Sequence, residues 1–289
     1  MDSLALLLVV SGALLHALWN LAAKRASAGG AGFVWTTCLI SVLASSPLAW
    51  WEWQQHSQAL NWQVGLAMTL SAILHVVYSL VLQRGYRESD FSIVYPIARG
   101  SGPMLSLVGA VLVLHEWPSP LGMVGILAVV GGVFVVAGAG KLFRQHEPKL
   151  RAGLMWGGIT GLFIAAYTVL DGWAIKTLKV PPLFYYASSL FIRILLLMPV
   201  ALKARQVLVA HWHRYWREAL VIGLLSPAAY TLVLYAMQRA PLSYVAPTRE
   251  LSMLLGTAMA AQLLKEEDLY SRLAGAGLMV VGVVLIAFA

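Results

Sequence analysis

Five charged side chains interrupt otherwise apolar stretches of this 289-residue sequence. Three are arginines and two are acids, namely Arg99, Asp171, Arg193, Arg249 and Glu250. A charged residue in an apolar segment of membrane-spanning length is costly, so it usually faces a cavity, an opposite charge or a ligand. A guanidinium group can hold a carboxylate or a phosphate through two parallel hydrogen bonds. The arginines therefore predict a site that recognises an anion.

Arg99 and Arg249 are the strongest candidates for contacting a substrate. Each follows a proline by two or three residues, and a proline inside a helix leaves backbone carbonyl groups without their usual partners. We predict that the two guanidinium groups reach one shared pocket from opposite sides of a membrane. In the competing interpretation, Arg249 pairs with Glu250 or Asp171 and has only a structural role.

Aromatic and polar residues of the same segments extend this predicted site. His16 and Asn20 lie one helical turn apart on a shared face, and the reference pKa of histidine, about 6.5, suits a coupling proton. The aromatic residues could form a box around a ligand, or they could serve only in packing. The predicted substrate-binding residues are Trp19, Asn20, Tyr78, Tyr95, Arg99, Tyr167, Tyr230 and Arg249, and the predicted coupling residues are His16, His75, Asp171 and Glu250.

The elements that must position these residues are predicted to be transmembrane helices. Hydrophobic residues make up 60% of the chain and charged residues 11%, against about 25% charged residues in soluble domains. Such a composition excludes a soluble enzyme, because too few polar residues remain to cover a surface. A span needs about 20 mostly apolar residues, and ten segments fit: Leu4–Ala23, Phe33–Trp50, Val64–Leu82, Ser92–Leu114, Leu121–Ala139, Ala152–Leu170, Leu183–Leu202, Ala219–Met237, Tyr244–Leu264 and Leu273–Phe288.

The distribution of basic residues predicts how the helices are oriented. With ten spans, the loops that follow odd-numbered spans hold fourteen lysines and arginines, whereas the opposite loops hold only Lys176, Lys179 and Arg239. Loops rich in lysine and arginine stay on the cytoplasmic side. The charge distribution therefore predicts that both termini lie outside the cytoplasm.

An internal repeat divides the chain into two halves, 1–140 and 151–289. Residues 92–139 align with 242–289 at an offset of 150 without a gap, with eleven identities. The identities include Arg99 with Arg249 and Glu116 with Glu266. Because each half holds an odd number of spans, the second half enters the membrane from the opposite side. Such inverted repeats are typical of transporters that hold their substrate near the midplane.

Several motifs resemble those of the drug/metabolite transporter superfamily, in its ten-span form built from two EamA-like repeats. They are the stretch His16-Ala-Leu-Trp-Asn20, the openings Val94-Tyr-Pro96 and Val245-Ala-Pro247, the acids Glu116 and Glu266, and the glycine-rich fifth and tenth spans. The resemblance implies a transporter of small metabolites, with spans 1, 3, 4, 6, 8 and 9 lining its cavity. It also implies cytoplasmic termini, whereas the distribution of basic residues predicts termini outside the cytoplasm.

The sequence as a whole predicts a secondary transporter in the inner membrane. We expect it to move a small polar metabolite, anionic or zwitterionic, by alternating access within the lipid bilayer. No catalytic or nucleotide-binding motif is found, so we expect no enzyme activity, no cofactor, no metal and no nucleic acid. Two alternatives remain, a flippase for a lipid-linked head group and a lipid-processing membrane enzyme, and the protein is expected to be a monomer or a homodimer.

Overall fold

The computed structural model describes residues 1–26, 30–56, 61–136, 147–254 and 269–289, and the regular secondary structure in these ranges is helical. The helices are long because apolar runs with few helix-breaking residues fill most of the chain. They are α1 (Ser3–Arg25), α2 (Gly30–His56), α3 (Trp62–Glu88), α4 (Phe91–Leu114), α5 (Pro120–Val136), α7 (Glu147–Lys176), α8 (Pro182–Lys203), α9 (Arg205–Arg239), α10 (Leu242–Thr248) and α12 (Leu269–Phe288).

In the described ranges, seven of these helices are long and apolar enough to cross a membrane. They are α1, α2, α3, α4, α7, α8 and α9, while α5 and the apolar part of α12, Leu273–Phe288, are shorter apolar helices. The predicted span at 244–264 lies partly outside the described residues, which end at 254 before the gap. The chain is thus a multi-pass membrane protein, and the count of ten spans stays a prediction.

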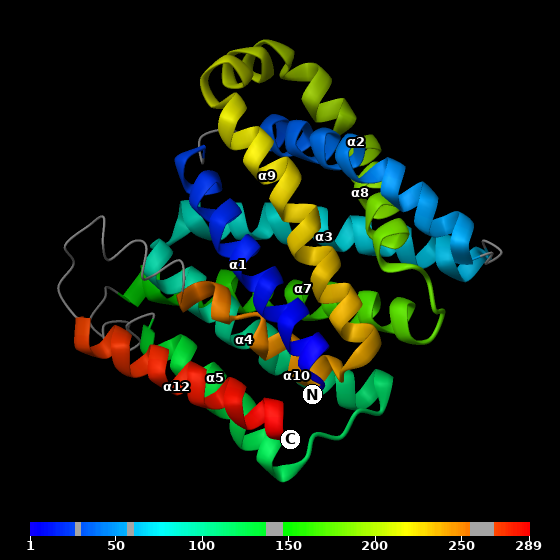
Figure 1. Ribbon diagram of the computed structural model, residues 1–289. Coiled ribbons are helices and arrows are strands. Elements are labelled where there is room, and N and C mark those ends of the chain that lie inside the picture. The colour runs from blue at the N-terminus through cyan, green and yellow to red at the C-terminus, as the bar shows by residue number, and fades with distance from the viewer. Residues whose placement is uncertain (27–29, 57–60, 137–146, 255–268) are drawn as a thin grey trace.

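The two halves exchange equivalent contacts, as expected of two copies of one unit (Figure 1). Helix α1 of the first half packs against α9 of the second half. The equivalent contact joins α7 of the second half to α3 of the first half. The pairs α2 with α8 and α5 with α12 join equivalent helices of the two halves directly. This two-repeat arrangement fits an inverted repeat, because each half contributes an odd number of predicted spans.

Glycines allow α5 and α12 to pack with their backbones in contact. A Cβ atom added at Gly125 would lie 2.8 Å from the backbone oxygen of Gly282, and one added at Gly132 would lie 2.7 Å from that of Gly275. No real Cβ atom tolerates such distances, so a side chain would push the two helices apart. Small residues are the usual means of close helix packing in membranes. The same four glycines form two identities of the sequence repeat, Gly125 with Gly275 and Gly132 with Gly282.

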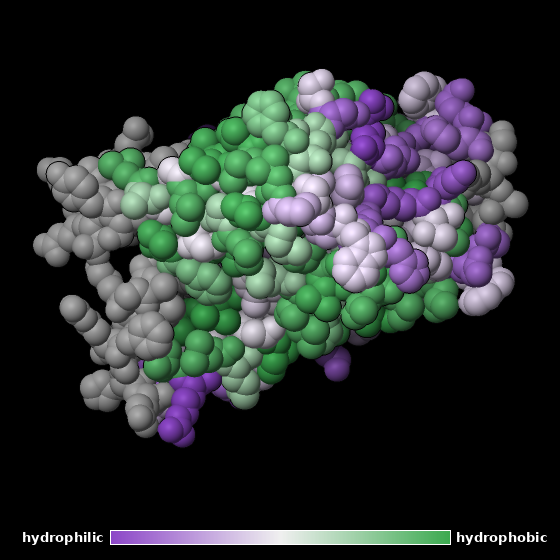
Figure 2. Space-filling view, turned by 90° about the horizontal axis from the view of Figure 1, so that it is seen from below, coloured by the Kyte–Doolittle hydropathy of each residue, from purple (hydrophilic) through white to green (hydrophobic). Residues whose placement is uncertain are grey.

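The outer surface is apolar over most of its area, while polar side chains gather towards one end. Figure 2 shows hydrophobic residues covering much of the visible face and hydrophilic ones collected near that end. Exposed leucines such as Leu7, Leu112 and Leu195 belong to this outer surface. Water is a poor solvent for such an exposed apolar surface, whereas lipid chains are a good one.

Polar contacts tie the helices together at the end of the molecule where both termini lie (Figure 1). Arg239 of α9 pairs with Asp2 at 3.0 Å, and Lys176 of α7 pairs with Glu116 at 2.5 Å. The other oxygen of Glu116 accepts the backbone N–H of Ser243 at the start of α10. These contacts join elements of both halves, and Glu116 serves as a contact between helix ends.

The opposite end is held by a second set of contacts between the halves. The indole of Trp156 in α7 donates a hydrogen bond of 2.6 Å to Glu88 at the end of α3. Lys149 pairs with Asp90 at 3.3 Å, and its backbone oxygen accepts a hydrogen bond from Ser89. Both ends of the bundle are therefore bridged by side chains.

A reporter at the C-terminus checks the orientation that the basic residues predict. The loops richer in lysine and arginine follow α1, α3 and α8, at the end opposite to the termini. We expect a fluorescent protein that folds only in the cytoplasm to stay dark when it is fused after Ala289. Bright cells would place the termini in the cytoplasm, and an alkaline phosphatase fusion, active only outside it, provides the matched control.

Candidate functional site

The site begins where the segment after α9 stops being a regular helix. α10 ends at Thr248, and turns follow at Arg249 and Glu250 before helical residues resume at 251. Pro247 has no N–H to continue the helical ladder, and the N–H of Glu250 bonds to the carbonyl of Pro247, three residues back, at 2.9 Å. The result is a broken helix inside an apolar bundle, a feature that transporters use to line a binding site. α4, by contrast, runs unbroken from Phe91 to Leu114.

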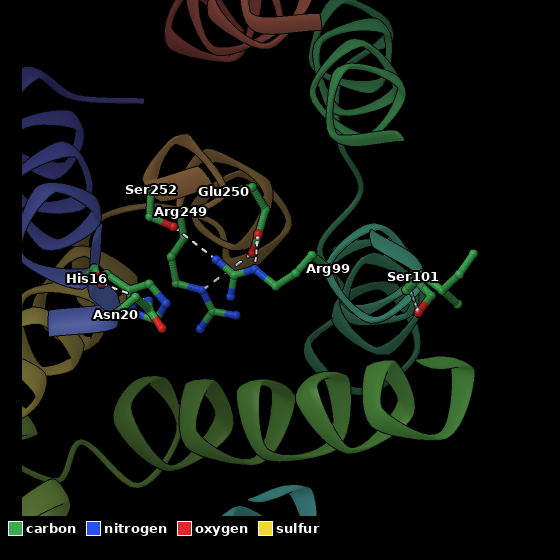
Figure 3. A network of polar contacts seen from close by, with 8 residues as sticks. His16, Asn20, Arg99, Ser101, Arg249, Glu250 and Ser252 are labelled. Atoms are coloured by element: carbon green, nitrogen blue, oxygen red, sulfur yellow. Dashed lines mark hydrogen bonds and ion pairs between the residues drawn. The ribbon is translucent and has the colours of Figure 1, made fainter. Parts of the chain in front are cut away.

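Arg99, Arg249 and Glu250 meet at this break, as Figure 3 shows. Nε of Arg99 lies 2.8 Å from a carboxylate oxygen of Glu250, and a terminal nitrogen of Arg99 donates to the hydroxyl of Ser252 at 2.9 Å. Nε of Arg249 lies 3.9 Å from the other carboxylate oxygen. All three charged side chains are at least nine-tenths buried. The two arginines therefore lie together with one acid between them, and a pocket that they share stays a prediction.

The hydrogen-bonding capacity of this cluster is only partly used. Nε of Arg249 is buried without a hydrogen-bond acceptor. The close contact of Arg99 with Glu250 is not aligned as a hydrogen bond, since Nε of Arg99 and Oε2 of Glu250 both lack a hydrogen-bond partner. A guanidinium carries five N–H donors. The cluster can therefore accept a further anionic group.

The positive and negative charges of the cluster do not balance, because only one repeat supplies an acid. Arg99 and Arg249 are repeat mates, whereas the mate of Glu250 is Gly100. A Cβ atom at Gly100 would lie 2.4 Å from the ring of Phe134, so this ring occupies the space that a second acid would need. With both guanidinium groups charged and Glu250 ionised, the cluster carries one positive charge in excess.

α1 brings a polar face to the arginine cluster. His16 and Asn20 lie beside Arg249, while Ser101 lies on the far side of α4 and bonds to its own helix (Figure 3). The amide of Asn20 donates to the backbone oxygen of His16 at 2.8 Å. The ring of Trp19 meets the ring of His16 edge-on, with centroids 4.8 Å apart, and its N–H is buried without an acceptor.

Asp171 forms a separate centre held by two tyrosines. The hydroxyl of Tyr230 in α9 donates to one carboxylate oxygen at 2.6 Å, and that of Tyr185 in α8 donates to the other at 2.7 Å. Asp171 is completely buried. Among the described residues no basic side chain lies within ion-pair distance of it, so it is not the partner of Arg249 that one sequence interpretation allowed.

His75 and the predicted tyrosines form an aromatic cluster next to Asp171. The imidazole stacks on Tyr167 with centroids 3.9 Å apart and meets Tyr230 edge-on at 5.5 Å. Tyr78 contacts Tyr167 edge-on at 5.7 Å. Nδ1 of His75 bonds to the backbone oxygen of Ser71. These contacts engage a face of the His75 ring and one of its nitrogens, which favours a packing role for this histidine.

The structure divides the predicted site into two neighbouring groups. Arg99, Arg249, Glu250, His16 and Asn20 lie together, and the ring of Tyr95 lies 5.9 Å from the Arg99 guanidinium carbon. The other tyrosines gather around His75 and Asp171, whereas Trp19 contacts His16. The described ring contacts therefore do not form a single aromatic box that includes all the predicted rings.

Some residues of these centres were not predicted. Ser252 and Tyr185 contact Arg99 and Asp171 directly, yet a serine or a tyrosine inside an apolar helix is common in packing and gives no signal by itself. The only sequence signal for Tyr185 is its place beside a second tyrosine, Tyr186, in an otherwise apolar run.

Comparison with known families and folds agrees with this architecture. The EamA-like transporter family model matches residues 3–138 and matches again over 151–288. A solved structure titled "Crystal structure of protein" is similar over 100% of this chain and 98% of its own, with a TM-score of 0.74 and 14% sequence identity. Such low identity shows the fold alone. No curated protein matches the sequence.

The two family matches together cover nearly the whole chain, so the protein belongs to the EamA-like transporter family. This family membership confirms the resemblance to the drug/metabolite transporter superfamily. It makes the chain a membrane transporter of two repeats.

Proposed function

We propose that this protein is a secondary transporter of a small polar metabolite that carries a carboxylate or a similar anionic group. The observation that carries the proposal is the pair of buried guanidinium groups of Arg99 and Arg249, which share one acid at a broken helix. An excess positive charge deep in a membrane is costly, and a bound anion offsets that cost. The proposed membrane is the inner, or plasma, membrane.

The polar groups around the arginines favour a ligand that accepts hydrogen bonds. Nε of Arg249 and the indole N–H of Trp19 are buried donors without acceptors. A buried donor without a partner costs about 1–3 kcal/mol. A substrate carboxylate between Arg99 and Arg249 would supply acceptors, and the ring of Tyr95 would border it. A zwitterion fits as well if its ammonium group points towards the tyrosines or Asp171.

Glu250 gives the site a means of coupling transport to protons. Its carboxylate and the substrate anion compete for the same two guanidinium groups, so protonation of Glu250 would free Arg99 and Arg249 for the substrate. Protonation of His16, which lies beside Arg249, would add positive charge to the same site. Protonation of Glu250 and protonation of His16 both favour binding of the anion. We therefore propose symport of a proton with the anion.

Alternating access would open the two ends of the bundle in turn. The contacts of Glu116 with Lys176 and Ser243 bridge the end that holds the termini. The contacts of Glu88 and Asp90 with α7 bridge the other end. In the proposed cycle one set breaks while the other holds, so that the central arginines face one side at a time.

Uptake into proteoliposomes tests the proposed function. We expect purified protein to accumulate a small carboxylate or amino acid from a mixed panel, and we expect a pH gradient, acidic outside the vesicle, to drive this uptake. Cationic compounds of the same size should not be accumulated. Uptake of cations with exclusion of all anions would overturn the proposal, and the exchange of labelled lipid head groups would favour a flippase.

A further inference from the structure

Arg193 is a third buried arginine that the central site does not use. It lies in α8, and its side chain is more than nine-tenths buried. One terminal nitrogen donates to the hydroxyl of Ser189 at 3.3 Å, and the guanidinium lies 5.1 Å from the ring centre of Tyr186. Its Nε is buried without an acceptor. In the part of the chain that the structure describes, no carboxylate lies within ion-pair distance of it.

Arg193 lines a small pocket between α2, α3 and α8. The pocket has a volume of about 40 Å³ and is lined by Val34, Cys38, His75, Val76, Ser79, Leu80, Gln83, Arg193 and Leu197. A single water needs roughly 10–15 Å³ of such space, so the pocket has room for a small ion with a little water. Metabolite sites are far larger, about 300–1,000 Å³. None of the lining residues is acidic.

The equivalent junction in the other half holds a carboxylate. There Glu52 of α2 accepts the backbone N–H of Phe184 at 2.9 Å and the hydroxyl of Tyr235 at 2.5 Å. Aligning Tyr78-Ser-Leu-Val-Leu82 with Tyr230-Thr-Leu-Val-Leu234, an offset of 152, places Gln83 opposite Tyr235. At offsets of 150 to 152 Val34 corresponds to 184–186, and both Gln83 and Val34 line the pocket. The positions of α8 that correspond to Glu52 are 202–204, with the sequence Leu-Lys-Ala. One junction thus contains its own anion, and the junction near Arg193 contains a cation.

The charges at the nearby end of the bundle favour entry of an anion. Gln83 lies close to the end of α3, where Arg87 is exposed and Arg84 pairs with Glu88, and α8 ends at the exposed Lys203. Such a concentration of positive charge raises the local concentration of anions. Most of the pocket wall is apolar, which favours an ion that loses its hydration shell at low cost. A guanidinium is itself weakly hydrated and suits such an ion.

We infer that the pocket at Arg193 binds a small monovalent inorganic anion of the chloride class. The anion accepts the free N–H of Arg193 and offsets the charge of this buried guanidinium, which has no carboxylate within ion-pair distance among the described residues. Hydroxyl groups connect this site to the centre, since Ser189 lies 3.4 Å from Ser71 and Ser71 contacts His75. The inference does not depend on which metabolite is transported.

Thermal stability in different salts tests this site without any transport assay. In detergent, replacing gluconate by chloride at constant ionic strength should raise the Tm of the wild-type protein by about 2–4 °C, the shift expected for roughly 1 kcal/mol of ligand binding. Arg193→Met should abolish the chloride effect. Val34→Phe, which fills the pocket with an aromatic side chain, should abolish it while Arg193 remains. Arg205→Met removes an exposed charge at the same end and should keep the full shift.

A bromide soak of crystals locates the ion independently. We expect an anomalous peak within contact distance of the Arg193 guanidinium, and we expect it to disappear in Val34→Phe. An equal chloride shift in Arg193→Met and in the wild type would overturn the proposal, as would a bromide peak only at Arg99 and Arg249. Neither result would affect the proposed anion transport, because that function is measured by uptake and by variants of the central arginines.

Discussion

Replacing either central arginine by lysine should weaken substrate binding by roughly ten- to a hundredfold. Arg99→Lys and Arg249→Lys keep the positive charge near Glu250 but lose the planar fork that grips an anion through two hydrogen bonds. A hydrogen bond to a charged group contributes about 1.5–3 kcal/mol, which corresponds to that range of Kd. Equilibrium binding of the substrate found in the uptake panel, measured in detergent, gives the value directly.

The control for this prediction separates binding from folding. Arg205→Lys makes the same change at an exposed position and should leave both binding and Tm unchanged. The expression and Tm of the two central variants should fall less than their affinity. If both central variants bind and transport normally, or if both fail to fold, the arginines are structural and the proposal of an anionic substrate is wrong.

Glu250→Gln should abolish proton-driven accumulation while substrate exchange continues. In the proposed mechanism, a fall in pH protonates Glu250 in the wild type, removes its competition for Arg99 and Arg249 and strengthens anion binding. Glutamine does not titrate, so the competition at this position no longer changes with pH. Anion binding should therefore no longer strengthen as the pH falls. Uptake driven by a pH gradient and counterflow without a gradient, measured on the same proteoliposomes, distinguish the two processes.

His16→Gln provides the companion measurement. Because His16 lies beside Arg249, its protonation also favours the anion at low pH, and its loss should flatten the pH dependence in part. His75→Gln should have a smaller effect on the pH dependence, since His75 is stacked on Tyr167 and bonded to Ser71. Full proton-driven accumulation by the Glu250→Gln protein would show that coupling resides elsewhere, and Asp171 with its two tyrosines would be the next candidate.

Hydropathy predicted most of the helices because lipid selects for apolar runs of fixed length. The predicted span Leu183–Leu202 differs from α8 by one residue at each end, and Ser92–Leu114 differs from α4 by one. α9 is the clear exception, because it starts at Arg205 and not at the predicted residue 219. Its first part carries aromatic and basic residues, and a kink at Tyr215 (φ −127°, ψ 25°) separates it from the apolar part. Hydropathy detects the lipid-embedded part of a helix and misses a polar extension.

The residues of the central site were predictable, but their pairing was not. Charges in apolar segments are conspicuous because burying them is costly, so Arg99, Arg249, Glu250 and Asp171 stand out in the sequence. Arg249 and Glu250 are neighbours in the turns after α10, yet Glu250 lies nearer to Arg99 than to Arg249, a pairing that adjacency in the sequence does not predict. The tyrosines that bind Asp171 come from two other helices, and only the tertiary fold brings them there.

The glycine seam between α5 and α12 bears on the ancestry of the molecule. In a dimer of two unfused halves, this seam would be a contact of one helix with its own copy, and each substitution would occur on both sides. An acid at the position of Glu250 would then face an identical acid, and two carboxylates would neutralise two guanidinium groups. In a single chain the two halves differ in sequence, so one half holds Gly100 where the other holds Glu250. An odd charge at a pseudo-symmetric centre is therefore a property that a symmetric dimer of identical halves cannot have and that the single chain can.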